Sequence, residues 1–225
     1  MKPNNRFSRL LAFALSLVLG LSLSLPALAA GEDDIIYIHT AKDLCALSDS
    51  CAYDVWSRGK TVLLTADISL RGVDFEPIAS FSGTFNGGGH TISGLTLTDS
   101  LSPAGLFLTL ERGAYIHALK VEGQVTPGGM KEAVGGIVGR NYGTLEECSF
   151  FGVVKGNSAV GGIAGRNEES GLIANCTASG SISASRYTGG IAGYNLGTLR
   201  ACINSAGVNT SNVDSSLSLD DLSID

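Results

Sequence analysis

The sequence predicts an all-β solenoid, a parallel β-helix with a short helical cap at its N-terminal end. The strongest observation is a phrase that occurs three times, at Val134–Asn141, Val160–Asn167 and Thr188–Asn195. Its copies begin at residues 134, 160 and 188, so the period is 26 and then 28 residues. Repeats of this length are typical of stacked architectures, in which each unit buries its apolar face only against its neighbours.

Antiparallel hairpins in a sandwich or a propeller would also produce frequent turn residues. A parallel stack explains better why the same residue types return once per repeat. An asparagine closes each copy, and its amide can hydrogen-bond along a ladder while its backbone tolerates left-handed angles at a corner. The residues expected in this structural role are Gly136, Gly139, Gly162, Gly165, Gly190, Gly193 and Asn167, with Asn141 and Asn195 in the same ladder.

Residues 1–29 are predicted to be a secretory signal peptide. Three basic residues precede the apolar run Leu10–Leu25, and the small residues Ala27 and Ala29 suit a cleavage site. The alternative, a membrane anchor, needs about 20 apolar residues, which is more than this run supplies. Cleavage removes three positive charges and changes the formal charge from −6 to −9. This charge argues against nucleic acid and anionic membranes as partners, and we expect a secreted, extracellular or surface-associated protein.

The mature chain divides into a capping region, a stack of coils and a tail. Within residues 30–58 we expect a strand over 35–38 and a helix from Thr40 to about Ser57, because Thr40 and Asp43 suit a capping box. Residues 59–207 form the coils, which repeat most clearly over 134–207. Residues 208–225 lose the pattern and are acidic, so we expect a disordered tail. No cap is evident for the last coil, which leaves it open to end-to-end contact.

Five cysteines in an exported protein raise the question of disulfides. Cys45 and Cys51 are close enough in sequence to form a disulfide around a small loop, and the sequence leaves open whether they do. Cys148, Cys176 and Cys202 occupy one repeat position. We therefore expect these three to stack as small buried side chains, one in each coil.

A Gly-hydrophobic-hydrophobic-Gly core recurs at residues 136–139, 162–165 and 190–193, and it resembles the GLUG motif of bacterial surface proteins. The segment Phe81–Leu95 resembles the opening coils that commonly precede such motifs. Together these features cover most of residues 35–207. The resemblance implies a right-handed, pectate-lyase-like β-helix that is secreted by a bacterium or displayed on its surface. Such repeats occur in adhesin-like proteins and beside the catalytic domain of streptococcal immunoglobulin A peptidases.

On this fold we expect a non-enzymatic adhesion or display module that binds a glycan or a host or matrix protein through the β-helix turns. Tyr142 and Tyr194, beside Asn141 and Asn195, are the residues we expect on a ligand face, because aromatic rings stack on sugars. A purely structural spacer would carry no ligand at all.

The enzymatic alternative is a polysaccharide lyase or hydrolase, or an accessory fragment of an immunoglobulin A peptidase-like protein. Glycoside hydrolysis needs two carboxylates across one cleft, whereas the pairs Glu146–Glu147 and Glu168–Glu169 fall at different repeat offsets. His90 lies in a glycine-rich turn, and we interpret it as a corner residue held by hydrogen bonds. Metal-ligand spacings are absent from the sequence, so no metal or cofactor is expected.

Overall fold

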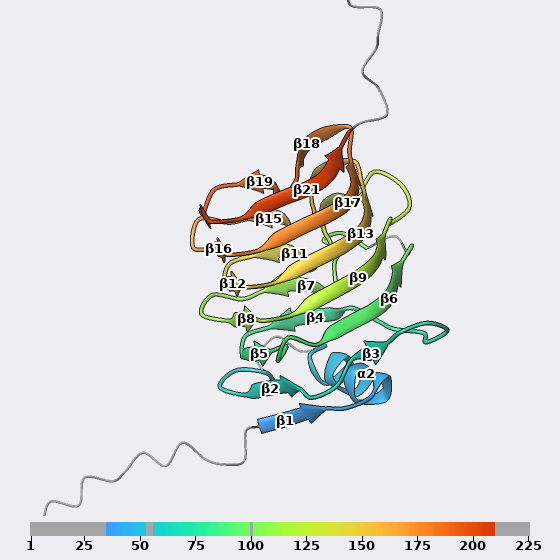
Figure 1. The fold of residues 1–225 in the computed structure, drawn as a ribbon, viewed down its shortest axis with the longest axis vertical. Helices are drawn as coiled ribbons and strands as arrows, with labels where there is room; N and C mark the ends of the chain where they lie inside the picture. The colour runs from blue at the N-terminus through green and yellow to red at the C-terminus, as the bar shows by residue number, and fades with distance from the viewer. Residues whose placement is uncertain (1–34, 53–55, 100, 210–225) are drawn as a thin grey trace, which may run out of the picture. The chain divides into compact units, whose positions relative to one another are not determined.

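A computed structural model describes residues 35–52, 56–99 and 101–209. Within these residues the chain winds as a parallel β-solenoid of about six turns, with one short helix near its start (Figure 1). The predicted all-β parallel β-helix with an N-terminal helical cap is therefore confirmed. The predicted signal peptide and residues 210–225 of the predicted tail lie outside the described residues.

The strands form four parallel sheets, which we name A to D. Sheet A contains β1 (Ile35–Ile38), β2 (Thr61–Leu64), β5 (Thr84–Asn86), β8 (Tyr115–His117), β12 (Thr144–Glu146), β16 (Leu172–Ala174) and β20 (Thr198–Arg200). Sheet B contains β3 (Ile68–Ser69), β6 (Thr91–Leu97), β9 (Lys120–Val125), β13 (Ser149–Lys155), β17 (Thr177–Ser183) and β21 (Ile203–Val208). Sheet C contains β4 (Ile78–Phe81), β7 (Phe107–Leu110), β11 (Val138–Asn141), β15 (Ala164–Asn167) and β19 (Ala192–Asn195). Sheet D contains β10 (Glu132–Gly135), β14 (Ser158–Gly161) and β18 (Arg186–Gly189).

One complete coil passes through sheets D, C, A and B in that order, as β10, β11, β12 and β13 do. The next coil repeats this path, and like residues align, as in the pairs Val134 with Val160 and Asn141 with Asn167. In-register stacking of the three copies is what the repeat predicted.

The helix α2 (Ala41–Ser50) packs against β1 and β4. Its N-terminus has the predicted capping box, in which the Thr40 hydroxyl accepts from the Asp43 backbone and the Asp43 carboxylate accepts from the Thr40 backbone. The buried side chains of Leu44 and Leu47 join the solenoid core. The helix ends at Ser50, earlier than the predicted Ser57, because Cys51 leaves helical angles with φ −85° and ψ 8°.

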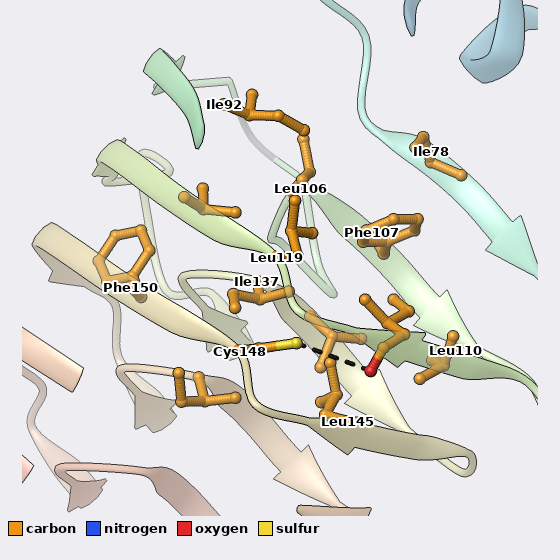
Figure 2. Close-up of a cluster of buried hydrophobic side chains, with 14 of the residues drawn as sticks. Ile78, Ile92, Leu106, Phe107, Leu110, Leu119, Ile137, Leu145, Cys148 and Phe150 are labelled. Atoms are coloured by element: carbon orange, nitrogen blue, oxygen red, sulfur yellow. Dashed lines mark hydrogen bonds between the residues drawn. The ribbon is translucent and has the colours of Figure 1, made fainter. Parts of the chain in front are cut away.

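A continuous apolar core runs through the coils (Figure 2). Phe81, Phe85 and Phe107 meet edge-to-face within it, with ring centroids 5.5 to 6.2 Å apart. The predicted cysteine stack is also present. The thiol of Cys148 donates to the Ile116 carbonyl at 3.6 Å, and Cys176 makes the same contact one coil later with Leu145 at 3.7 Å.

The three asparagines form the predicted amide ladder. Asn141 Nδ2 donates to Asn167 Oδ1 at 2.7 Å, and Asn167 Nδ2 donates to Asn195 Oδ1 at 2.7 Å. None of the three uses the left-handed angles that asparagine tolerates, since none has a positive φ. Left-handed angles occur at the corner between sheets A and B, at residues such as Glu147 and Asn175 immediately before each stacked cysteine, and within the strands of sheet D, at Ala133, Ala159 and Tyr187.

The repeated glycines lie where neighbouring backbones touch. A Cβ atom on Gly165 would overlap the backbone of Ala133 and Val134, and one on Gly193 would overlap Val160. A side chain at this position would push sheet C away from sheet D, so only glycine permits the close approach.

The disulfide considered between Cys45 and Cys51 is not formed, and both residues are free thiols. Along a helix, a sequence separation of six residues places the two Cα atoms about 9 Å apart along the axis, which exceeds the roughly 7 Å limit for a bridge. Cys51 is buried, and burial raises the pKa of its thiol to about 11.

Candidate functional site

The outer face of sheet B carries a column of glycines on three consecutive coils. Gly123 pairs in register with Gly152, and Gly152 pairs with Gly180. A Cβ atom on Gly152 would overlap the Gly123 carbonyl, and one on Gly180 would overlap the Gly152 carbonyl. The backbone φ of these two residues, +155° and +105°, also favours glycine. The column is therefore a strip of bare backbone with no side chains above it.

Side chains rise on both sides of this strip. In β13, Phe150 and Val154 face the core, whereas Phe151 and Val153 flank Gly152 and are 59% and 38% exposed. Strands β9 and β17 follow the same pattern. Because the glycines carry no side chains, the flanking side chains become the two banks of a groove.

The groove has a volume of about 860 Å³. The glycine column lines it, together with Arg71 and Phe75 of the loop after β3. Its banks carry Ser93, Thr96, Glu122, Gln124, Phe151, Val153 and Ser181.

This lining combines neutral hydrogen-bonding groups with an exposed aromatic ring. Hydroxyl and amide groups such as those of Thr96 and Gln124 match sugar hydroxyls, and Phe151 offers a face on which a sugar ring can stack. Among the described lining residues, Glu122 is the single carboxylate and Arg71 the single cation. The groove is thus suited to hold a neutral or weakly charged chain molecule along the solenoid axis.

The residues predicted for ligand binding lie elsewhere. The prediction for Asn141 is wrong, because its side chain is fully buried and its amide is used in the ladder. Asn195 is exposed on the last described coil. Tyr194 lies on sheet C in register with Arg166, whereas Tyr142 follows Asn141 by one residue. The two tyrosines therefore occupy different repeat positions and do not form one column.

The sequence did contain a signal for the groove. Gly152 and Gly180 each follow the stacked cysteine by four residues, and Gly123 follows Leu119 by the same distance. This second glycine period does not by itself predict a groove, because glycine at a turn and glycine in a strand look alike in a sequence.

The described glutamates do not build a column of carboxylates. Glu132 pairs in register with Ser158, and Glu146 pairs with His117 and Ala174. The Tyr115 hydroxyl donates to Glu146 Oε2 at 2.7 Å, and this bond raises the pKa of Tyr115 to about 12. Glu146 is therefore part of a satisfied network on the outer face of sheet A.

His90 behaves as the turn residue that its sequence context indicated. Its Nδ1 lies 3.3 Å from Asp67 Oδ1, and the same carboxylate oxygen accepts from the Thr91 backbone at 2.9 Å. These bonds lower the pKa of Asp67, with the backbone bond as the largest cause.

In the part of the chain that the structure describes, no helix is long and apolar enough to cross a membrane.

Comparison with known proteins supports the motif and the fold. Residues 156–183, which span one coil from β14 to β17, match the GLUG motif. The chain is 33% identical over 150 residues to halomucin from Haloquadratum walsbyi, a match that covers 60% of this chain and 2% of halomucin. The chain thus spans a very small part of the length of this relative.

A solved structure, that of a candidate immunoglobulin A1 protease from Bacteroides ovatus, is also similar. The TM-score is 0.51 with 18% sequence identity, over 80% of this chain and 79% of that chain. At this level of identity the likeness shows the fold alone, and the shared β-helix agrees with the GLUG resemblance.

Proposed function

We propose that this chain is an extracellular β-helix module that binds a glycan in the groove of sheet B. The observation that carries the proposal is the glycine column Gly123–Gly152–Gly180, which opens a groove between banks of polar and aromatic side chains. The binding surface is thus a strand face, rather than the turns that the sequence favoured.

Three observations support a location outside the cell, at a surface or in the medium. The sequence begins with a predicted signal peptide. The chain is similar to halomucin, and the solved structure it resembles is described as a candidate protease of immunoglobulin A1, an antibody found outside cells. In this location the β-helix would attach to a surface that carries the glycan.

The enzymatic alternative predicts a second carboxylate across the groove from Glu122. Hydrolysis of a glycosidic bond uses two carboxyl groups about 5 to 10 Å apart. Among the described residues that line the groove, Glu122 has no such partner. We therefore expect binding without turnover, and product analysis of any bound glycan tests this point directly.

A glycan array with the purified protein, followed by titration of the best ligand, tests the proposal. Phe151→Ala should weaken binding about 2- to 10-fold, the equivalent of one aromatic contact. Ser181→Trp should block the groove by its bulk, and circular dichroism would show whether the variant is folded. The double variant Tyr142→Ala and Tyr194→Ala is the matched control and should bind normally. Binding that survives both groove variants and disappears in the control would disprove the groove and return the site to the turns.

A further inference from the structure

The outer face of sheet C carries a second feature, a column of cationic and aromatic side chains. Arg140 pairs in register with Arg166, and Arg166 pairs with Tyr194. Neighbouring strands lie about 4.8 Å apart, so the column places two guanidinium groups on adjacent coils. Like charges directly opposite one another destabilise a sheet unless something compensates them.

Arg166 is compensated within the chain. Its Nε donates to Glu168 Oε1 at 3.0 Å, and its Cζ lies 4.5 Å from the ring centroid of Tyr194. Glu168 follows Arg166 by two residues, and its side chain is only 12% exposed. One guanidinium of the pair therefore has a nearly buried carboxylate and an aromatic ring as partners.

Arg140 lacks the equivalent partner. The residue two positions later is Tyr142, so the carboxylate present in the next coil is missing here. Among the described residues no ion pair involves Arg140, and its Nε is buried without a hydrogen-bond partner. The residue as a whole is only partly buried, so part of its side chain is accessible to solvent.

We propose that Arg140 binds the carboxylate of an acidic sugar, which takes the place that Glu168 occupies beside Arg166. A guanidinium fork fits a planar carboxylate through two parallel N–H bonds, and among the described residues no carboxylate is paired with the guanidinium of Arg140. This site is on sheet C, separate from the groove of sheet B, and the choice of a sugar as the carrier of the carboxylate rests on the proposed function. It gives the module a means to select charged over neutral glycans.

Titration calorimetry with a galacturonate oligomer tests the site, with the matching galactose oligomer, acetate and inorganic sulfate as further probes. The galacturonate oligomer should bind the protein with Kd below about 1 mM, and Arg140→Met should weaken this binding at least about 10-fold. Arg140→Lys should weaken it as well, because lysine keeps the charge and loses the fork. Arg200→Met removes an exposed cation from sheet A and should leave binding unchanged.

A reconstitution variant provides the sharpest comparison. Tyr142→Glu places a carboxylate two residues after Arg140, as Glu168 stands after Arg166, and should abolish galacturonate binding while it raises the melting temperature. The same Tyr142→Glu variant should leave binding of a neutral glycan to the groove of sheet B unchanged, which separates the two sites. The proposal is overturned by absent binding at about millimolar galacturonate, by equal affinity of the Arg140→Met variant, or by sulfate that binds as tightly as the sugar acid.

Discussion

Replacement of Asn167 by alanine should destabilise the protein far more than the same replacement of Asn195. Both residues end the same repeated phrase and both belong to the amide ladder. Asn167 is fully buried, whereas Asn195 is exposed on the last described coil. The two variants thus remove the same chemical group from one motif in two different environments.

The expected magnitude follows from the groups that Asn167→Ala leaves without partners. Its Oδ1 accepts from Asn141 Nδ2 at 2.7 Å, and its Nδ2 donates to the Gly171 carbonyl at 3.2 Å and to Asn195 Oδ1. The amide of Asn141 and the carbonyl of Gly171 would both lose this partner. At roughly 1–3 kcal/mol for each of these two unsatisfied buried groups, the free energy of unfolding should fall by about 2–6 kcal/mol.

Asn195→Ala should lower the free energy of unfolding by less than about 1 kcal/mol, because water can replace an exposed partner. Urea denaturation followed by circular dichroism measures both values by linear extrapolation. If the two variants differ by less than about 1 kcal/mol, then the ladder does not stabilise the core through buried hydrogen bonds and the reasoning fails.

Three further predictions concern other parts of the fold. Gly152→Ala should lower the free energy of unfolding by about 2–5 kcal/mol, through backbone strain and overlap of the new Cβ with the Gly123 carbonyl. Gly113 has open space around it, so Gly113→Ala should lower the free energy of unfolding by about 1 kcal/mol in the same urea assay. Tyr115 should titrate near pH 12 in ultraviolet absorbance, with Tyr115→Phe as the blank, and Glu146→Gln should lower that pKa. Since the folded pKa of Tyr115 exceeds its unfolded value of 10.0, the associated stability is complete below pH 10.0 and is lost as the pH rises to about 12. Thr40→Ala should remove about 1 kcal/mol by loss of the helix cap, measured by thermal unfolding, and an unchanged melting temperature would contradict the capping role.

The repeat predicted the fold because stacking acts on residues that face inward. In the repeated coils each unit lies on a copy of itself, so an inward residue must fit a like residue on the neighbouring coils, as Asn167 does between Asn141 and Asn195. These positions return at a fixed period and are visible in one sequence. The capping box of Thr40 was equally predictable, since it depends on residues only three apart.

Two outcomes have local physical causes. The sequence leaves a Cys45–Cys51 bridge open, and the helix between the two residues holds them too far apart. Asparagine tolerates left-handed angles, but in this solenoid such angles occur at the corner that contains Glu147 and in the strands of sheet D. Neither outcome could be read from residue types, because both depend on where the chain turns within a coil.

The candidate sites were hard to predict for the opposite reason. Outward side chains do not have to pack against the core of the neighbouring coils. They therefore differ from coil to coil, whereas the inward side chains next to them are repeated. Arg140, Arg166 and Tyr194 share one outward column, beside an inward column of three asparagines. In the groove, Glu122 is in register with Phe151 on the next coil. Function in this solenoid is therefore to be sought where the repeats diverge, whereas the phrase that first identifies them marks the residues that hold the coils together.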